Sequence, residues 1–436
     1  MGLISSRVFD FKSFQNLNRH VQKNTIYYII VFFWLVYART LFFGYIADDF
    51  ALVPLSFKEA ADWAFDFYIF RPLCYFSFPF FGYFSTSSVF QHLLNLILFT
   101  ISIYLAYKVC MSYKVGQLTS SLVVLIWTLI PWNAFNATWI SQRHYILMNI
   151  FVLASLLLFN RTKYIHSVAS YLMACLFNVS CALLGIYYWF CLFLKKKTKI
   201  LIFFSSCLLI YGLCMIIAMV ANKTKTAGPI YNYTSSPVFI LLGHTWFFFE
   251  GIATQLVPAP FFVNYWHTGL YLLFLFLFLF SVKFQWNKLK DNVGIIIIFL
   301  LVMIPAFRRP VLSVHTFPSF ILILIISQII QIKHKRLFNI AIFTLIIFYL
   351  GSIYVTQNNF NTGICNLSFP KHGTSKDAYP SAYYQLRKKM LLHVFEKLTH
   401  QFLNPSQKRD KRELYNGPQN LDNRLSSPYN KVGGAR

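Results

Sequence analysis

Long apolar runs, each close to the length of a membrane span, repeat along this chain from about residue 26 to residue 355. A hydrocarbon core about 30 Å thick needs roughly 20 apolar residues of helix to cross it. The runs are continuous rather than alternating, so they predict helices and not the strands of a membrane barrel. Only 12% of the 436 residues are charged, about half the share typical of soluble domains. We therefore expect an all-α polytopic membrane protein.

Lys and Arg residues at the ends of these runs predict how the chain is oriented. Cytoplasmic loops carry the excess of Lys and Arg, so the basic segment 1–25 is expected to stay in the cytoplasm and the first loop, 47–87, to lie outside. On this basis the transmembrane domain 26–355 contains about eleven spans. They are expected at about 26–46, 88–109, 117–130, 142–160, two short ones within 167–194 broken near 178–183, 200–221, 268–282, 293–306, 312–330 and 337–355.

Two segments do not fit a simple span. If the run 238–262 crossed the membrane, Lys283, Lys288 and Lys290 would lie outside, against the positive-inside tendency. We therefore expect 238–262 to be re-entrant or to lie on the surface, which is tolerated where backbone lines a cavity. Residues 356–436 form a polar, basic tail with one helical stretch, and the remainder has the composition of a disordered segment.

Two adjacent carboxylates, Asp48 and Asp49, follow the first span directly. The whole chain has only 13 Asp and Glu residues, and a carboxylate at a membrane surface is costly enough to be a functional candidate by default. The simpler alternative is that both acids only solvate the end of the span. The functional interpretation is a general base, or a pair that holds a divalent cation, which the residues leave open. In the same loop, acids at 59, 62 and 66 opposite aromatic residues predict a helix lying in the membrane interface.

Four arginines are expected at outer ends of spans. Arg71 either anchors the loop to lipid phosphate or supplies the forked donors that hold a phosphate leaving group. Arg143 needs a partner at the mouth of its span, and an acid of the first loop or a ligand phosphate would serve. Arg308 and Arg309 run against the positive-inside tendency, which favours an anion as their partner.

Other polar residues within the apolar runs are candidates for the site that the Asp48–Asp49 pair and the arginines would form. His92 and Asn95 share a helix face, and the structural interpretation, hydrogen bonds between helices, is favoured for them. Glu250 is the only carboxylate between Asp66 and Asp291, so it either pairs with an arginine or contacts a substrate.

The charge and the cysteines exclude other classes. The net charge of +26 does not indicate nucleic-acid binding, because Lys and Arg mark the ends of apolar runs, where they meet anionic lipid. The eight cysteines lie mostly inside apolar segments, without metal-ligand spacing or a disulfide framework, and are interpreted as small buried hydrophobic residues.

Several short motifs resemble those of the membrane-embedded glycosyltransferases of the GT-C type, closest to the dolichyl-phosphate-mannose mannosyltransferase branch and its bacterial relatives. The first three occur in order, and two further stretches are similar to that family's turn before span four and to its late segment. They are Asp48-Asp49, Arg71-Pro72-Leu73, His92 with Asn95, the stretch 129–144 that includes Arg143 and His144, and the stretch 305–319 that includes His315. The chain departs from that branch because it has no tetratricopeptide array, and because His315 and Thr316 stand where the family tends to have aromatic residues.

The resemblance implies a GT-C type bundle with an interfacial helix in its first outer loop. It also implies a polyprenyl-phosphate sugar donor, an acceptor hydroxyl on a glycan, lipid or protein, and a first-loop Asp that acts as general base with inversion. The arginines would stabilise the departing lipid phosphate. The membrane would be a bacterial inner membrane, or that of the endoplasmic reticulum in a eukaryote.

Two alternatives remain open from the residues. A flippase or transporter of lipid-linked glycans would carry charged residues through the mid-depth of several spans. An O-antigen-type polymerase or ligase would share the location and the lipid-phosphate chemistry. The ionisable residues of this chain gather mostly at the outer ends of spans, which favours an enzyme over a transporter.

Overall fold

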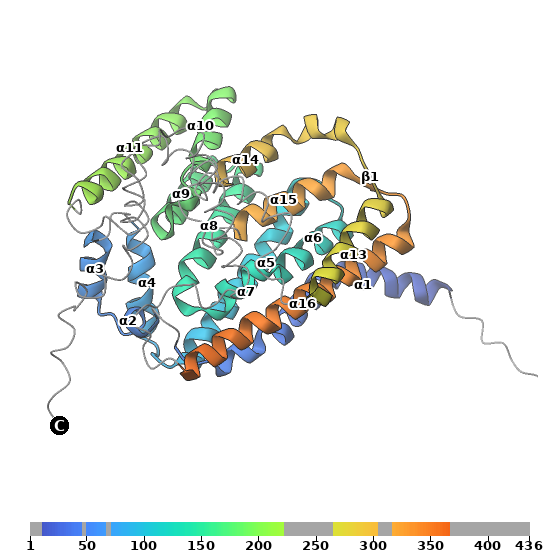
Figure 1. The fold of residues 1–436 in the computed structure, drawn as a ribbon. Helices are drawn as coiled ribbons and strands as arrows, with labels where there is room; N and C mark the ends of the chain where they lie inside the picture. The colour runs from blue at the N-terminus through green and yellow to red at the C-terminus, as the bar shows by residue number, and fades with distance from the viewer. Residues whose placement is uncertain (1–10, 46–48, 67–70, 222–264, 304–315, 367–436) are drawn as a thin grey trace, which may run out of the picture.

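The computed structural model describes residues 11–45, 49–66, 71–221, 265–303 and 316–366, and these are nearly all helical (Figure 1). The α-helices are α1 (Phe11–Tyr37), α2 (Asp49–Leu52), α3 (Phe57–Asp66), α4 (Pro72–Gly82), α5 (Ser88–Ser112), α6 (Gln117–Leu129), α7 (Pro131–Thr138), α8 (Arg143–Asn160), α9 (Tyr164–Phe177), α10 (Leu184–Leu194), α11 (Thr198–Ala221), α13 (Tyr265–Ser281), α14 (Val293–Met303), α15 (Thr316–Ile329) and α16 (Lys335–Asn366). The short elements are the 3-10 helices η1 (Ala38–Phe42), η2 (Ile140–Gln142), η3 (Val179–Cys181) and η5 (Trp286–Asn292), and the strands β1 (Val282–Phe284) and β2 (Ile330–Ile332).

Five helical stretches within the described residues are long and apolar enough to cross a membrane, and α6 with α7 makes a sixth if that bent pair is one span. This supports a helical membrane protein, whereas the count of eleven spans stays a prediction. The five are Asn24–Phe42, Ser88–Ser112, Ile140–Asn160, Thr198–Ile217 and Lys335–Asn358, and shorter apolar helices are Tyr164–Phe177, Leu184–Leu194, Trp266–Ser281 and Thr316–Ile329.

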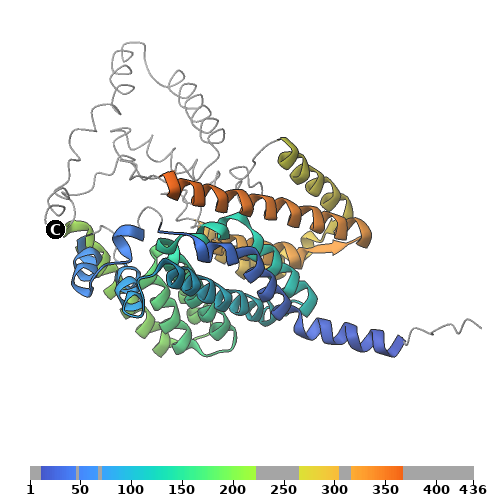
Figure 2. The same cartoon turned by 90° about the horizontal axis from the view of Figure 1, so that it is seen from below.

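The ends of the first and last helices differ from the expected domain boundaries. Helix α1 begins at Phe11, so it includes much of the basic segment expected before residue 26. Its first turns project from the rest of the bundle (Figure 2). Helix α16 continues to Asn366, beyond the boundary expected at residue 355. The run 238–262 and most of the tail lie outside the described residues.

The outer turn expected at 131–139 is instead mostly helix, and all residues of α7 are buried. Ile130 has a non-helical ψ of 133°, in line with the tendency of a residue before proline to leave the helical region. Pro131 then occupies the first position of a new helix, where its missing N–H costs nothing. The result is a bend of 64° between α6 and α7, which turns α7 into the bundle against α5 and α16.

The first loop contains three helices rather than the single expected one. At the start of α3, the Glu59 carboxylate accepts hydrogen bonds from the Ser56 backbone N–H and hydroxyl at 2.8 and 2.7 Å, and the Glu59 N–H donates back to the Ser56 hydroxyl at 3.2 Å. This is a capping box, and the bonds from Ser56 lower the pKa of Glu59. Ala60 and Ala64 are buried while Asp62 is exposed, so α3 is amphipathic and packs on α4. Helix α4 was not expected from the sequence.

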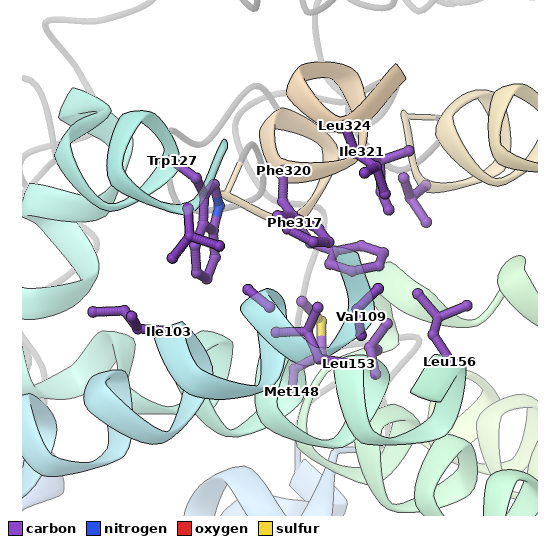
Figure 3. Packing of buried hydrophobic residues seen from close by; sticks show 14 of the residues in the cluster. Ile103, Val109, Trp127, Met148, Leu153, Leu156, Phe317, Phe320, Ile321 and Leu324 are labelled. Atoms are coloured by element: carbon purple, nitrogen blue, oxygen red, sulfur yellow. The ribbon is translucent and has the colours of Figure 1, made fainter. Parts of the chain in front are cut away.

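The core is centred on Trp127 of α6. Its ring stacks on Phe99 of α5 at 5.7 Å between centroids and meets Phe320 of α15 edge-on at 5.4 Å. Its indole N–H donates a 2.8 Å hydrogen bond to the carbonyl of Thr316. Figure 3 shows Trp127 together with other side chains of the same cluster, which come from α5, α8 and α15. Trp127 therefore joins three helices and also satisfies its one polar atom.

A two-stranded ribbon joins the ends of α13 and α15, which the sequence did not predict. Strand β1 pairs antiparallel with β2, and Lys283 lies opposite Gln331. The Lys-rich segments after α13 and after α15 are thereby held side by side. Both segments were expected on the cytoplasmic face, and the pairing agrees with placing them on one face.

We predict that Lys288→Cys reacts with a membrane-impermeant maleimide only after the membrane has been opened, because its segment is expected in the cytoplasm. Ser85→Cys, in the first outer loop, is the matched control and should react in intact cells. Reaction of position 288 in intact cells would contradict the expected placement of 238–262.

We predict that Trp127→Ala lowers the free energy of unfolding by about 3–5 kcal/mol, the usual cost of truncating a large buried aromatic residue. Thermal unfolding of the detergent-solubilised protein measures this loss. Trp286→Ala is the control, because the Trp286 side chain is 67% exposed. Equal melting temperatures for the two variants would mean that Trp127 does not organise the core.

Candidate functional site

The Asp49 side chain is buried at the start of α2, with no exposed surface. One carboxylate oxygen accepts a 2.7 Å hydrogen bond from the backbone N–H of Ser141 in η2. Helix α8 begins directly after η2, so the carboxylate lies at the positive end of that helix, which stabilises negative charge. This contact brings together residues that are 92 positions apart in the sequence. Asp48 lies outside the described residues.

Arg143 is the first residue of α8 and is fully buried. Its Nε donates to Asn95 Oδ1 at 2.8 Å, and its Nη2 donates to Gln91 Oε1 at 2.6 Å and to the Gln91 carbonyl at 3.2 Å. The guanidinium also lies 5.6 and 5.3 Å from the ring centroids of Phe78 and Phe81 of α4, within the range of cation–π attraction. Four neutral side chains and one carbonyl thus surround a buried cation.

The Asp49 carboxylate and the Arg143 guanidinium are also close enough to attract each other electrostatically. Tyr45, at the end of the first span, is within electrostatic reach of both groups. Arg143 Nη1 is buried and has no hydrogen-bond partner among the described residues. A buried charge with an unused donor is costly, so an anionic ligand at this atom would relieve that cost.

Arg71 stands just before α4 and contributes a second cation at the same end of α8. Its Nη2 donates to the Tyr75 hydroxyl at 3.0 Å, and its Nε is buried without a partner among the described residues. Arg71 interacts electrostatically with His144 and with Tyr145 in the first turn of α8. Two arginines and a helix N-terminus therefore favour an anion here.

The remaining polar candidates connect elements around this point. His92 Nε2 lies 3.3 Å from the carbonyl of Gly44, and Asn95 Nδ2 donates to the carbonyl of Trp139 at 3.4 Å. His144 Nδ1 lies 2.8 Å from the carbonyl of Ser141. The contacts of His92 and Asn95 connect α5 with the segment after η1 and with the segment between α7 and η2, and the roles expected for these two residues stay predictions.

Six of the residues predicted from the sequence thus lie around the start of α8 and the facing turn of α5. These are Asp49, Arg71, His92, Asn95, Arg143 and His144. Asp48, Glu250, Arg308, Arg309 and His315 lie outside the described residues, so their placement stays a prediction.

Sequence reasoning missed Gln91, Ser141 and the two α4 phenylalanines. Gln91 could have been found, because it lies one helical turn before Asn95 on the same face. Ser141 acts through its backbone N–H, which no side-chain pattern reveals. Phe78 and Phe81 lie in a helix that the sequence analysis treated as loop.

A divalent cation would need oxygen ligands. Near the start of α8, the carboxylate that the described part of the chain supplies is that of Asp49. No group of three His, Cys, Asp or Glu side chains able to hold a metal occurs in the described ranges. Asp48 lies outside those ranges, so a metal held by the Asp48–Asp49 pair stays a prediction.

The arrangement can hold a phosphate group beside a carboxylate. Arg71, Arg143 and the N-terminus of α8 supply positive charge, and the Ser141 amide fixes the Asp49 carboxylate beside them. Comparison with known proteins adds no relative: no protein-family model, curated protein or solved structure matches the chain.

We predict that Asn95→Ala lowers the free energy of unfolding by about 1–3 kcal/mol, because it leaves the buried Arg143 Nε unpaired. Asn160→Ala is the matched control, since the Asn160 bond to Ser112 is exposed, and exposed substitutions usually change stability by about 0.5 kcal/mol or less. Thermal unfolding of both variants in detergent measures the difference. If Asn95→Ala melted like the control, Arg143 would not depend on this bond.

Proposed function

We propose that this protein is an integral-membrane glycosyltransferase of the GT-C type. It would transfer a sugar from a polyprenyl-phosphate donor to an acceptor hydroxyl at the outer face of a bacterial inner membrane. The observation that carries the proposal is the convergence of a buried carboxylate, Asp49, and a buried guanidinium, Arg143, at the N-terminus of one apolar helix. The motif resemblance supports the same chemistry.

In the proposed reaction, the acceptor hydroxyl gives its proton to a carboxylate of the Asp48–Asp49 pair as its oxygen attacks the anomeric carbon. The bond from that carbon to the phosphate oxygen breaks, and the oxygen leaves with the electron pair as part of polyprenyl phosphate. Attack from the face opposite the leaving group inverts the configuration. Arg71 and Arg143 would stabilise the charge that develops on the phosphate.

The distribution of buried charge favours transfer over transport. Within the described residues, the buried side chains of Asp, Glu, Lys and Arg are Asp49 and Arg143 alone, and they lie at the same end of the bundle. A transporter would be expected to carry such groups at mid-depth in discontinuous helices, where substrate and coupling ions bind.

We predict that Asp48→Asn and Asp49→Asn each leave the protein nearly inactive. Loss of the one that is the general base should reduce sugar transfer by about 10²–10⁴-fold, and the resemblance favours Asp48 as that base and Asp49 as the residue that positions it. Asparagine keeps an oxygen that can accept the Ser141 bond, so the protein should remain folded and should still bind the donor. The assay measures transfer of a labelled sugar from polyprenyl phosphate in membranes, with expression checked in parallel.

Asp62→Asn is the matched control, because Asp62 is an exposed acid of the same loop; it should transfer at the wild-type rate. Wild-type transfer by the double variant Asp48→Asn, Asp49→Asn would rule out carboxylate catalysis. In that case the lipid-linked glycan transporter would become the better proposal.

A further inference from the structure

Two cysteines meet at the tip of the α9–α10 hairpin. Cys175 is in the last turn of α9, and Cys181 ends η3, six positions later. Their sulfur atoms lie 3.8 Å apart, which is van der Waals contact. Both side chains are buried, with 0% and 1% of their surface exposed. The two thiols are therefore in direct contact inside the packed hairpin.

The backbone around the pair is held on both sides. Helix α9 stops because Asn178 is extended, and the Asn178 side-chain oxygen accepts hydrogen bonds from the Ser180 N–H and hydroxyl at 2.9 and 2.6 Å. The Tyr211 hydroxyl donates to the Cys175 carbonyl at 3.1 Å, and the Tyr171 hydroxyl donates to the Ala182 carbonyl. These hydrogen bonds hold the turn between α9 and α10 in a conformation that places Cys181 beside Cys175.

The charges of the hairpin indicate where this tip lies. Lys163 precedes α9 and Lys195 to Lys197 follow α10, whereas the segment between them has no Lys or Arg. Such charges mark the cytoplasmic side, so the tip is directed away from the cytoplasm. Helix α4, which belongs to the loop expected outside, packs against α9. The tip therefore points to the compartment in which disulfides form and persist.

We propose that Cys175 and Cys181 form a disulfide in the mature protein. During folding, before both thiols are buried, the thiolate of one cysteine would attack the disulfide of a thiol oxidase and form a mixed disulfide. The second thiolate then displaces the oxidase sulfur, so the two cysteines lose two electrons and two protons while the oxidase disulfide becomes two thiols. The bond would close the hairpin tip covalently. This proposal is independent of the proposed transferase activity.

The test uses the full-length protein in membranes of cells that have a thiol oxidase in the outer compartment. The sample is acid-quenched and denatured, free thiols are blocked with N-ethylmaleimide, and the sample is reduced and labelled with a polyethylene-glycol maleimide. We expect a gel shift of two labels for the wild type and none for Cys175→Ser. Cys207→Ser, a thiol of α11 outside the pair, is the control and should keep the shift.

A mass measurement on the wild-type protein keeps the test independent of how the variants fold. Trypsin releases a peptide after Lys163 that ends at Lys195 and contains Cys175, Cys181 and Cys191. We expect N-ethylmaleimide on Cys191 only, and a mass two hydrogens below that of the reduced form. Blocking of all three thiols without prior reduction, or a wild type without the gel shift, would overturn the proposal.

Discussion

The arrangement of the first half of this chain depends on the burial of one arginine. Removing a guanidinium from water costs several kcal/mol unless hydrogen-bond acceptors and opposite charge surround it. Arg143 has such contacts with several separate elements. Gln91 and Asn95 come from α5, the phenylalanine rings from α4, and the compensating charge from Asp49 of α2. The same contacts that stabilise the cation therefore position α2 and α4 at the start of α8. Fold and candidate site share one set of interactions.

A second constraint is the proline that separates α6 from α7. Pro131 disfavours the helical region at Ile130, where the chain bends inward and buries α7. Asn136 of α7 then donates a 2.5 Å hydrogen bond to the Thr316 hydroxyl, and Trp127 of α6 donates to the carbonyl of the same residue. The first turn of α15 is thus fixed from both sides of the bend. A late helix of the chain is held close to the elements that carry the site.

Much of the helical pattern could be predicted, because apolar run length and charged ends are properties of the sequence itself. The break near Asn178, the amphipathic α3 and the same-face pair His92 and Asn95 were recognised in this way. The missed elements depend on tertiary contacts. Helix α4 packs its Phe78 and Phe81 rings on the Arg143 guanidinium. The ribbon forms only when two segments far apart in the sequence meet.

The candidate site was expected from the sequence at its charged residues and at His92, Asn95 and His144, but not at Gln91, the Ser141 amide or the α4 phenylalanines. Asp49 and Arg143 stood out because charges are rare in this chain. That Asp49 binds a backbone N–H of η2, and that Gln91 offers two acceptors to one nitrogen, follows from three-dimensional placement. Backbone donors have no sequence signature, so this part of the site could not have been predicted.

The ribbon of β1 and β2 has a consequence for the order in which the protein is made. Gln331 leaves the ribosome 48 residues after its partner Lys283. Strand β1 therefore has no partner strand until α14, α15 and β2 have been synthesised. The ribbon therefore forms late in synthesis, and it links the ends of α13 and α15 only after both helices have been made.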